Sequence, residues 1–521
     1  MAYVRTARLG GEAREMLTLI AALLTSILLC GLRLDVARVV GLGDAEALFV
    51  AYGFHPQPAY VGHPGLIGWI ARGFGPEPAP RTLHFFTALA ATALPWVGVL
   101  AARACGASGR AALRAYFPLA LIPAFSIGSF AFSPDLPLCF FWLCTLGCAG
   151  WALRQPVLSF GALLASVGVG AGAALCCLSK LSGWLLALSL LAACIGRFAA
   201  PRWRTLAPWA ACGLFGILTA PLVTWWLTRG LSLQLDPELS WQHASMTLLR
   251  PLVTVTPPFL YAGVVLIRDL TSRARQAPMD RLLRLSLLAP LVPLLLLGVC
   301  TTTETDWLTP AYLALSLHAT LAPPLRKGLV RSCFGLGMAV ALLGWAWLRT
   351  DLPFATGRLL GGYDPSLDSS NDLYAWGPGK TLLETAVMTA HERTGRTPIV
   401  VGPHWAVCAQ AEVALGRHFH VGCDSVEVDD YDDWSDPALW ADVQTILFVT
   451  DTRFHRAPPE TFYGRPALAV HHVNVERFGQ TVRGISVTEF DRDESTARRS
   501  AVEAAGAKRA WTPAPTALPD Q

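Results

Sequence analysis

Residues 157–196 read VLSFGALLASVGVGAGAALCCLSKLSGWLLALSLLAACIG and contain a single charged side chain, that of Lys180. A helix that crosses a bilayer needs about 20 apolar residues. The stretch is therefore long enough for two spans, which we predict at 157–178 and 181–198. It indicates a membrane protein in which neighbouring helices are joined by very short turns.

Similar apolar runs recur from Met16 to about Arg349. Only 15% of the 521 residues are charged, whereas an average soluble protein has about 25%. We expect a polytopic α-helical membrane protein with about eleven transmembrane helices and a small α/β C-terminal domain. The predicted spans are 16–34, 83–102, 113–131, 135–153, 157–178, 181–198, 206–227, 251–268, 282–300, 307–323 and 330–348.

Three regions are expected along the chain. Residues 1–349 form the transmembrane domain, 350–490 a soluble α/β domain, and 491–521 a disordered tail. The first outer loop, 35–82, contains two apolar runs that are too short to cross the bilayer, AEALFVAYGF and HPGLIGWIARGF. We predict that both are amphipathic helices at the membrane interface.

The soluble domain alternates patterns typical of helices and strands. KTLLETAVMTAHERTG has a helical period and stops at Gly395, and HWAVCAQAEVALG is a second predicted helix. TPIVVGP and VQTILFVTD read as buried strands, and PALAVHHVNVERFGQTVRGISVTEF reads as further strands.

Basic loops indicate the orientation in the membrane, because Lys and Arg collect on the cytoplasmic side. With eleven spans, every loop expected inside contains Arg, namely 103–112, 154–156, 199–205, 269–281 and 324–329. The N-terminus is then cytoplasmic and the C-terminal domain extracytoplasmic. The net charge of +4 is too small to favour a nucleic-acid partner.

Cysteines give no metal-binding or disulfide pattern. Eleven of the 13 lie in or beside apolar runs, and only Cys408 and Cys423 belong to the soluble domain. In an oxidising compartment these two either pair or remain unpaired.

Several polar residues of the apolar region share the outer side in this topology. Ionisable groups near a membrane are costly and often functional. Simpler roles stay open for some: helix capping for Asp44, Glu46 and Asp135, and snorkelling to lipid headgroups for Lys180. The residues that could converge on one outer cavity are Asp44, Glu46, His63, Asp135, Lys180, Trp241, Gln242, His243, Glu304 and Asp306.

A fixed order of short motifs runs through the first 320 residues. The order is GDAEALF, YVGHPGLIGWIAR, SPDLPLCFFWL, LSKLSGWLL, WWL with SWQH, and TETDWLTPAYLAL. It resembles the bacterial relatives of dolichyl-phosphate-mannose protein mannosyltransferases, which include lipid A aminoarabinose transferases and are membrane glycosyltransferases of the GT-C type. NDLYAWG and FGQTVRG in the soluble segment are also similar to that family's extracytoplasmic domain.

The resemblance implies transfer of a sugar from a polyprenyl-phosphate donor to a cell-envelope acceptor at the outer face of the cell membrane. It implies catalytic roles for Asp44 and Glu46, and a carboxylate suits the removal of a proton from a hydroxyl nucleophile. A positive charge stabilises the leaving phosphate, and Lys180 is a candidate for this role. Further candidates are Arg72, Arg81 and Arg229. The expected donor-binding residues are His63, Asp135, Lys180, Trp241, Gln242 and Glu304.

Two departures from the family pattern keep other functions open. Ala45 separates two acids that are commonly adjacent, and Gly62 stands before His63 where an Asp is often found. A non-catalytic member that binds lipid-linked sugar or an envelope partner is one alternative, and a lipid-linked sugar transporter is another. No metal ligands are assigned. A divalent cation is possible, and VEVDDYDDW is either a solvated acidic loop or a calcium site.

Overall fold

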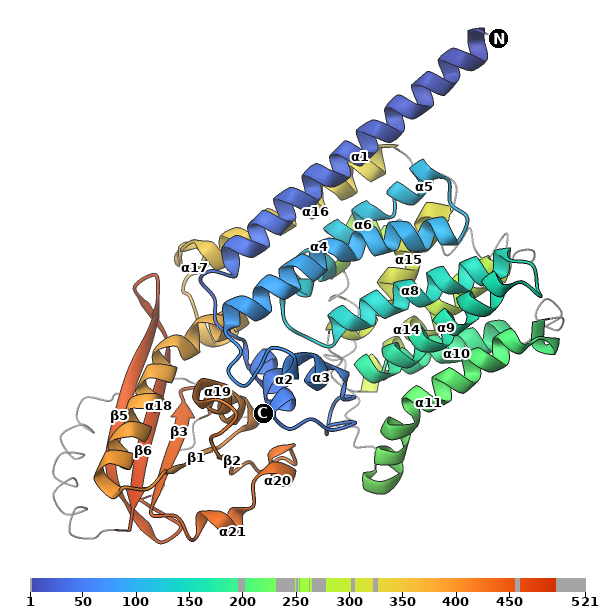
Figure 1. Ribbon diagram of the computed structural model, residues 1–521. Coiled ribbons are helices and arrows are strands. Elements are labelled where there is room, and N and C mark those ends of the chain that lie inside the picture. The colour runs from blue at the N-terminus through green and yellow to red at the C-terminus, as the bar shows by residue number, and fades with distance from the viewer. Residues whose placement is uncertain are drawn as a thin grey trace. The chain divides into compact units, whose positions relative to one another are not determined.

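The computed structural model describes residues 2–194, 202–230, 278–300, 305–321, 327–454 and 460–492, with a few residues between 249 and 264. The chain divides into two compact units (Figure 1). The helical unit comprises Met1–Val39, Pro56–Ile70 and Arg81–Arg349. The sheet unit comprises Val40–His55, Ala71–Pro80 and Thr350–Gln521. Two segments of the predicted first outer loop therefore fold with the C-terminal region.

Long apolar helices confirm a polytopic, multi-pass membrane protein. Six helices among the described residues are long and apolar enough to cross a bilayer, or seven if one bent pair is a single span. The count of about eleven is not confirmed, and span 251–268 lies mostly outside the described residues. The six helices are α1 (Ala2–Val36), α4 (Pro80–Ala104), α8 (Asp135–Arg154), α9 (Phe160–Ser179), α11 (Leu206–Arg229) and α16 (Lys327–Arg349).

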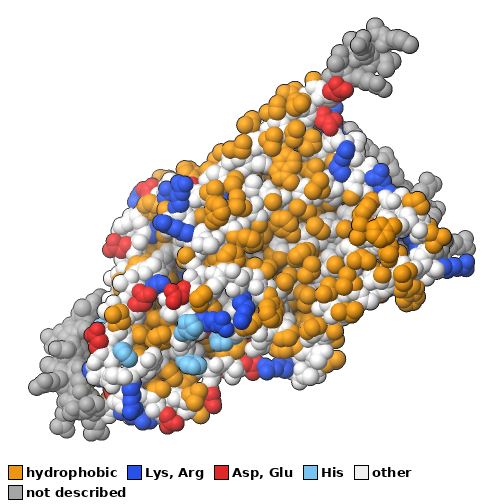
Figure 2. Space-filling model, in the orientation of Figure 1, with side chains coloured by type: hydrophobic (Ala, Val, Ile, Leu, Met, Phe, Trp, Pro, Cys, Tyr) orange, Lys and Arg blue, Asp and Glu red, His pale blue; other side chains and the backbone are white. Residues whose placement is uncertain are grey.

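Further helices occupy other predicted spans but differ from them in length. They are α10 (Gly183–Cys194), α14 (Pro278–Cys300) and α15 (Thr309–Leu321). The helical unit presents large apolar side chains outward, including Leu17 on α1, Leu164 on α9 and Ile217 on α11. Figure 2 shows a broad apolar face with charged side chains near its margins. Such a surface is suited to lipid rather than water.

The predicted span 113–131 is not one straight helix. It consists of α5 (Gly109–Leu113), α6 (Tyr116–Leu121), α7 (Pro123–Ser126) and a short turn, with a bend of 76° at the break. Pro123 lacks the N–H that would continue α6. The Arg33 guanidinium donates to the carbonyl oxygens of Phe125 and Ser126, at 3.1 Å each. This buried arginine therefore satisfies backbone groups that a broken helix leaves exposed to an apolar environment.

The sheet unit contains one six-stranded mixed sheet in the order β2-β1-β3-β6-β5-β4. β1 pairs in parallel with β2 and β3, whereas β3–β6 and β6–β5 are antiparallel. The predicted strands are confirmed as β1 (Ile399–Gly402), β3 (Thr445–Asp451), β5 (Arg465–Arg477) and β6 (Gln480–Asp491). The short strands β2 (Val421–Cys423) and β4 (Thr461–Phe462) were not predicted.

The central strand β3 is buried on both faces, as its continuous apolar run predicts. Leu447 and Val449 face the core beneath the two predicted helices, now α18 (Asp372–Thr394) and α19 (Trp405–Leu415). Ile446 and Phe448 face a second core around Trp440.

Shorter helices are α3 (Leu66–Arg72), α17 (Leu352–Leu360), α20 (Tyr431–Trp434) and α21 (Pro437–Trp440). All but the start of the predicted disordered tail, 491–521, lies outside the described residues.

Helix α2 (Asp44–Phe54) corrects the prediction of an amphipathic helix. Nine of its eleven residues are buried, which leaves no continuous polar face. It packs against α19, and a Cβ at Gly53 would lie only 2.7 Å from the Arg72 backbone nitrogen. The apolar side chains of AEALFVAYGF are thus used for protein packing within the sheet unit.

An ion pair that joins α1 to α16 gives a test of the helical unit. The Asp35 carboxylate accepts from Arg349 Nε at 2.7 Å and from Trp345 Nε1 at 2.9 Å. Because these groups are about one third exposed, we expect Asp35→Asn to cost about 1 kcal/mol of stability. Thermal unfolding of the purified protein measures this loss. Asp351→Asn is the matched control, since its pair with Arg358 is mostly exposed, and an equal loss in both variants would contradict the assignment.

Candidate active site

The candidate site lies at one edge of the sheet. β1 and β3 are parallel, so their carboxyl ends share that edge, which is where α/β sheets commonly bind ligands. His404 follows β1, and the segment Asp451–Arg453 ends β3. Asp44, the first residue of α2, belongs to the same cluster, since its carboxylate pairs with Arg453.

Asp44 is buried and held on both carboxylate oxygens. It is 7% exposed. Oδ1 accepts a hydrogen bond from Gln410 Nε2 at 3.0 Å, and Oδ2 pairs with Arg453 Nη1. Gln410 also donates to the carbonyl oxygen of Leu42, at 2.9 Å. Since each carboxylate oxygen has two acceptor positions, these contacts leave acceptor capacity on Asp44.

Arg453 is itself held on several sides. Its backbone N–H donates to Asp451 Oδ1 at 2.9 Å, and its Nη2 donates to Asp451 Oδ2 at 2.6 Å. Its guanidinium carbon lies 5.0 Å from the centroid of the Phe454 ring, which stacks on His404 with a centroid separation of 4.1 Å. Neighbouring carboxylates raise the pKa of Arg453 despite its burial. The guanidinium is therefore a fixed positive charge.

The motifs NDLYAWG and FGQTVRG meet at this cluster. Asp372, in the first motif, accepts from Arg483 Nη2, in the second, at 2.6 Å. Asp372 Oδ1 also lies 3.4 Å from Arg453 Nη1. Burial and the negative charge of Asp44 raise the pKa of Asp372. Three carboxylates and two guanidiniums thus share one cluster, which has a surplus of negative charge.

Glu46 has a different position from Asp44. Its Oε2 accepts from the backbone N–H of Gly43 at 2.7 Å, so it caps the N-terminus of its own helix. Ala45 between the two acids turns them to different sides of α2, since successive helical residues differ by about 100°. The capping role accounts for the burial of Glu46, and its catalytic role stays a prediction.

A second polar network continues from α2. His55 Nε2 and Glu412 Oε1 are 2.6 Å apart, and Tyr431 donates to Glu412 Oε2 at 2.7 Å. The Trp434 ring stacks on His55 with centroids 4.3 Å apart. Tyr52 donates to Asp430 at 3.0 Å. These contacts fix the C-terminal end of α2 within the sheet unit.

The helical unit holds the candidates Lys180, Asp135 and His63. Lys180, which follows α9, donates to both oxygens of Asp135 at 3.0 and 3.2 Å. Asp135 begins α8, as the helix-start interpretation predicts. His63 lies in a loop whose backbone accepts from Tyr60 N–H at 2.8 Å. The structure thus joins Asp135 with Lys180. Trp241, Gln242, His243 and Glu304 lie outside the described residues.

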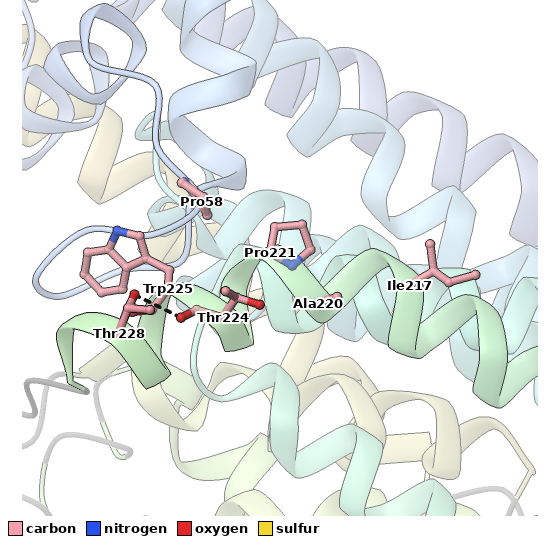
Figure 3. Close-up of a pocket in the computed structure, with 7 residues that line it drawn as sticks. All are labelled: Pro58, Ile217, Ala220, Pro221, Thr224, Trp225 and Thr228. Carbon is pink, nitrogen blue, oxygen red and sulfur yellow. Dashed lines mark hydrogen bonds between the residues drawn. The ribbon is translucent and has the colours of Figure 1, made fainter.

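An open groove of about 590 Å³ lies along α11 in the helical unit (Figure 3). Thr228 donates to the backbone carbonyl oxygen of Thr224, so this hydroxyl is used within the helix. Arg229 at the end of α11 lies over the Trp225 ring, with its guanidinium carbon 5.7 Å from the centroid. The lining is mainly apolar and comprises Pro58, Ile217, Ala220, Pro221, Thr224, Trp225 and Thr228.

The acidic stretch and the two cysteines belong to the sheet unit. Asp432 and Asp433 are exposed, whereas Asp430 is buried. Within the described residues, no three His, Cys, Asp or Glu side chains are placed to hold a metal ion. Cys408 and Cys423 are both buried and are free thiols in this structure. Burial raises the pKa of the Cys408 thiol.

Sequence reasoning missed the partners of Asp44. Arg453 and Gln410 were not among the candidates, and Asp372 and Arg483 appeared only inside motifs. One signal was available for Arg453: the polar segment TDTR (450–453) lies at the end of a buried strand, and such positions often line a binding edge in α/β sheets.

Solved structures support the fold. No protein-family model and no curated protein matches this chain. Its fold is similar to that of ArnT from Cupriavidus metallidurans bound to undecaprenyl phosphate, at 16% identity and a TM-score of 0.57, over 90% of this chain and 97% of that chain. The apo state of the same protein matches with the same identity and TM-score, over 92% and 98%. The resemblance derived from the motifs is therefore confirmed for the fold.

Asp429 provides a pH-dependent test of the acidic stretch. Burial and the nearby acids Asp432 and Asp430 raise its pKa to about 6. Because folding favours the protonated form, this group lowers stability as the pH rises from its unfolded pKa of 3.8 to about 6. We expect Asp429→Asn to raise the Tm by a few degrees at pH 7.5, and the gain to vanish near pH 4.

Thermal unfolding of the purified variants across this pH range measures the effect. Exposed Asp442, changed to Asn, is the matched control and should show no such dependence. A gain for Asp429→Asn that is constant with pH would contradict the assignment.

Proposed function

We propose that this chain is a membrane glycosyltransferase that moves a hexosyl or pentosyl group from a polyprenyl-phosphate donor to a cell-envelope acceptor. The observation that carries the proposal is the Asp44 carboxylate, which is buried, ion-paired and hydrogen-bonded at the carboxyl edge of the sheet. The family resemblance assigns the acceptor-activating acid to this position. The likeness to ArnT supports the fold, and the site supports the chemistry.

The proposed reaction is a single displacement. The acceptor hydroxyl gives its proton to Asp44 while its oxygen bonds to the anomeric carbon of the donor sugar. The bond between that carbon and the phosphate oxygen breaks, and polyprenyl phosphate leaves with the electron pair. Lys180 and Arg229 are the proposed cations for the phosphate, and His63, Trp241, Gln242, Asp135 and Glu304 complete the proposed donor site. No step is assigned to a divalent cation.

The groove along α11 supports a lipid-linked donor. Ile217 in its lining is 72% exposed, as a side chain that faces lipid would be. A polyprenyl chain is wholly apolar and suits such a surface. The ArnT structure contains undecaprenyl phosphate, and we propose the same class of carrier for this chain.

The proposal places the reaction outside the cytoplasm of a bacterial cell, in the cell membrane. It requires the N-terminus inside and the sheet unit outside, which follows from about eleven spans and their basic loops. We expect an alkaline phosphatase fusion after Asp491 to be active and a cytoplasmic reporter fused there to be silent. The reverse result would place the sheet unit in the cytoplasm and overturn the proposed topology.

Asp44→Asn tests the catalytic assignment. The variant keeps the size of the side chain but cannot accept the proton, so we expect transfer to fall at least about 100-fold. The assay uses purified protein in lipid vesicles with a set of polyprenyl-phosphate sugars and envelope extracts as acceptors. Glu384→Gln is the matched control, because Glu384 is a partly exposed acid that pairs with Lys380 on α18, and this variant should retain the wild-type activity.

The Asp44→Asn variant is then compared with a deletion strain in cells. Envelope glycans and glycolipids of a deletion strain and of the Asp44→Asn strain should lack the same sugar. Transfer at the wild-type rate by purified Asp44→Asn protein would refute the role of Asp44. Binding of the donor without turnover by the wild type would instead favour the non-catalytic alternative.

A further inference from the structure

We propose that Arg453 is a positioning residue that holds the Asp44 carboxylate for proton transfer, and that Asp372 and Asp451 hold Arg453 in place. This inference rests on the proposed function, since it gives Asp44 its catalytic role. It also gives a role to the motifs NDLYAWG and FGQTVRG, which the reaction itself does not use.

The argument begins with the geometry of the guanidinium. Arg453 uses Nη2 and Nε on Asp451, with Nε lying 3.1 Å from Oδ2, and this leaves Nη1 directed at Asp44 and Asp372. An arginine fork bound at two edges has a fixed plane, whereas a lysine ammonium rotates freely. Asp451 therefore fixes the orientation of the Arg453 guanidinium, and with it the direction of the positive charge that faces Asp44.

The second step concerns the chain segments that meet here. Asp44 comes from α2, Asp372 from α18, Gln410 from α19, Asp451 from β3 and Arg483 from β6. Arg483 anchors Asp372 at 2.6 Å, so the weaker contact of Asp372 with Arg453 is also held in place. Each charged group is thus fixed by another element of the sheet unit. This is the arrangement that orients a base without contact between the orienting residue and the substrate.

The third step concerns charge. A buried carboxylate needs a counter-charge, and Asp44 obtains it from Arg453. Without Arg453, the carboxylate would lie near Asp372 and Asp451 with only Gln410 as a hydrogen-bond donor among these residues. Repulsion between the acids would move Asp44 from its present rotamer. The expected defect is therefore in turnover, with little effect on donor binding.

Arg453→Ala and Arg453→Lys provide the test in the vesicle assay. We expect Arg453→Ala to lower kcat about 100-fold with an unchanged KM for the lipid donor, because misplacement of a base affects the chemical step. Arg453→Lys keeps the charge and should recover part of that loss. Methylguanidinium added at millimolar concentration should restore activity to Arg453→Ala and should leave Asp44→Asn inactive.

Arg393→Ala is the matched control within the same unit. Arg393 pairs with Glu489 and Asp491, so it resembles Arg453 in partners but lies outside the cluster. Its loss should lower the Tm without a kcat defect that methylguanidinium rescues. A rescue equal to that of Arg453→Ala would overturn the positioning role.

The outcomes separate the two proposals. An active wild type with Arg453→Ala at the wild-type kcat overturns the positioning role and leaves the proposed function standing. A wild type that transfers no sugar overturns both. If Arg453→Ala does not fold, the kcat and KM of Arg453→Lys decide, and a rise in KM alone contradicts the inference.

Discussion

The buried ion pair between Asp44 and Arg453 joins the start of α2 to the end of β3. A carboxylate that is 7% exposed is unfavourable without a partner, so α2 can occupy its position only if β3 ends in a suitably held arginine. Arg453 in turn depends on Asp451 and Asp372, and Asp372 depends on Arg483. The first outer loop, the end of β3, helix α18 and strand β6 are therefore linked by electrostatics as well as by apolar packing.

Local patterns in the sequence predicted the main helices and the longer strands of this unit. The uninterrupted apolar run of VQTILFVTD marked β3 as a strand buried on both faces, and Gly395 marked the end of α18, where it has a φ of +70°. The partners of Asp44 could not be derived in the same way. Arg453 is 409 positions away in the chain and Gln410 is 366 positions away, so neither spacing nor periodicity brings them together. A resemblance identified Asp44, but its surroundings required the fold.

The helical unit shows the same limit for a different reason. Apolar runs located its helices, but a run does not distinguish a straight span from a broken one. Pro123 breaks the predicted span 113–131, and the cost of exposed carbonyl groups is offset by Arg33, which comes from another helix. The amphipathic interpretation of AEALFVAYGF failed similarly. Apolar side chains that suit a membrane interface also suit packing against α19, and it is the burial of nine of the eleven residues of α2 that distinguishes the two.

If Asp44 is the general base, as we propose, the cluster around it is explained by function rather than by net stability. Replacing a buried ion pair with apolar residues of similar volume is often neutral or stabilising, so such pairs contribute little net stability. The sheet unit already has two apolar cores, around Leu447 and around Phe448. Arg465 differs from Arg453 in its partners. It is buried and donates hydrogen bonds to the backbone carbonyl oxygens of Trp440, Ala441 and Val443. Among the described residues, the hydrogen-bonded partners of the Arg453 side chain are all carboxylates. One of these carboxylates, that of Asp44, retains acceptor capacity. A group of charges that adds little stability but determines the direction of one carboxylate is what a general base requires.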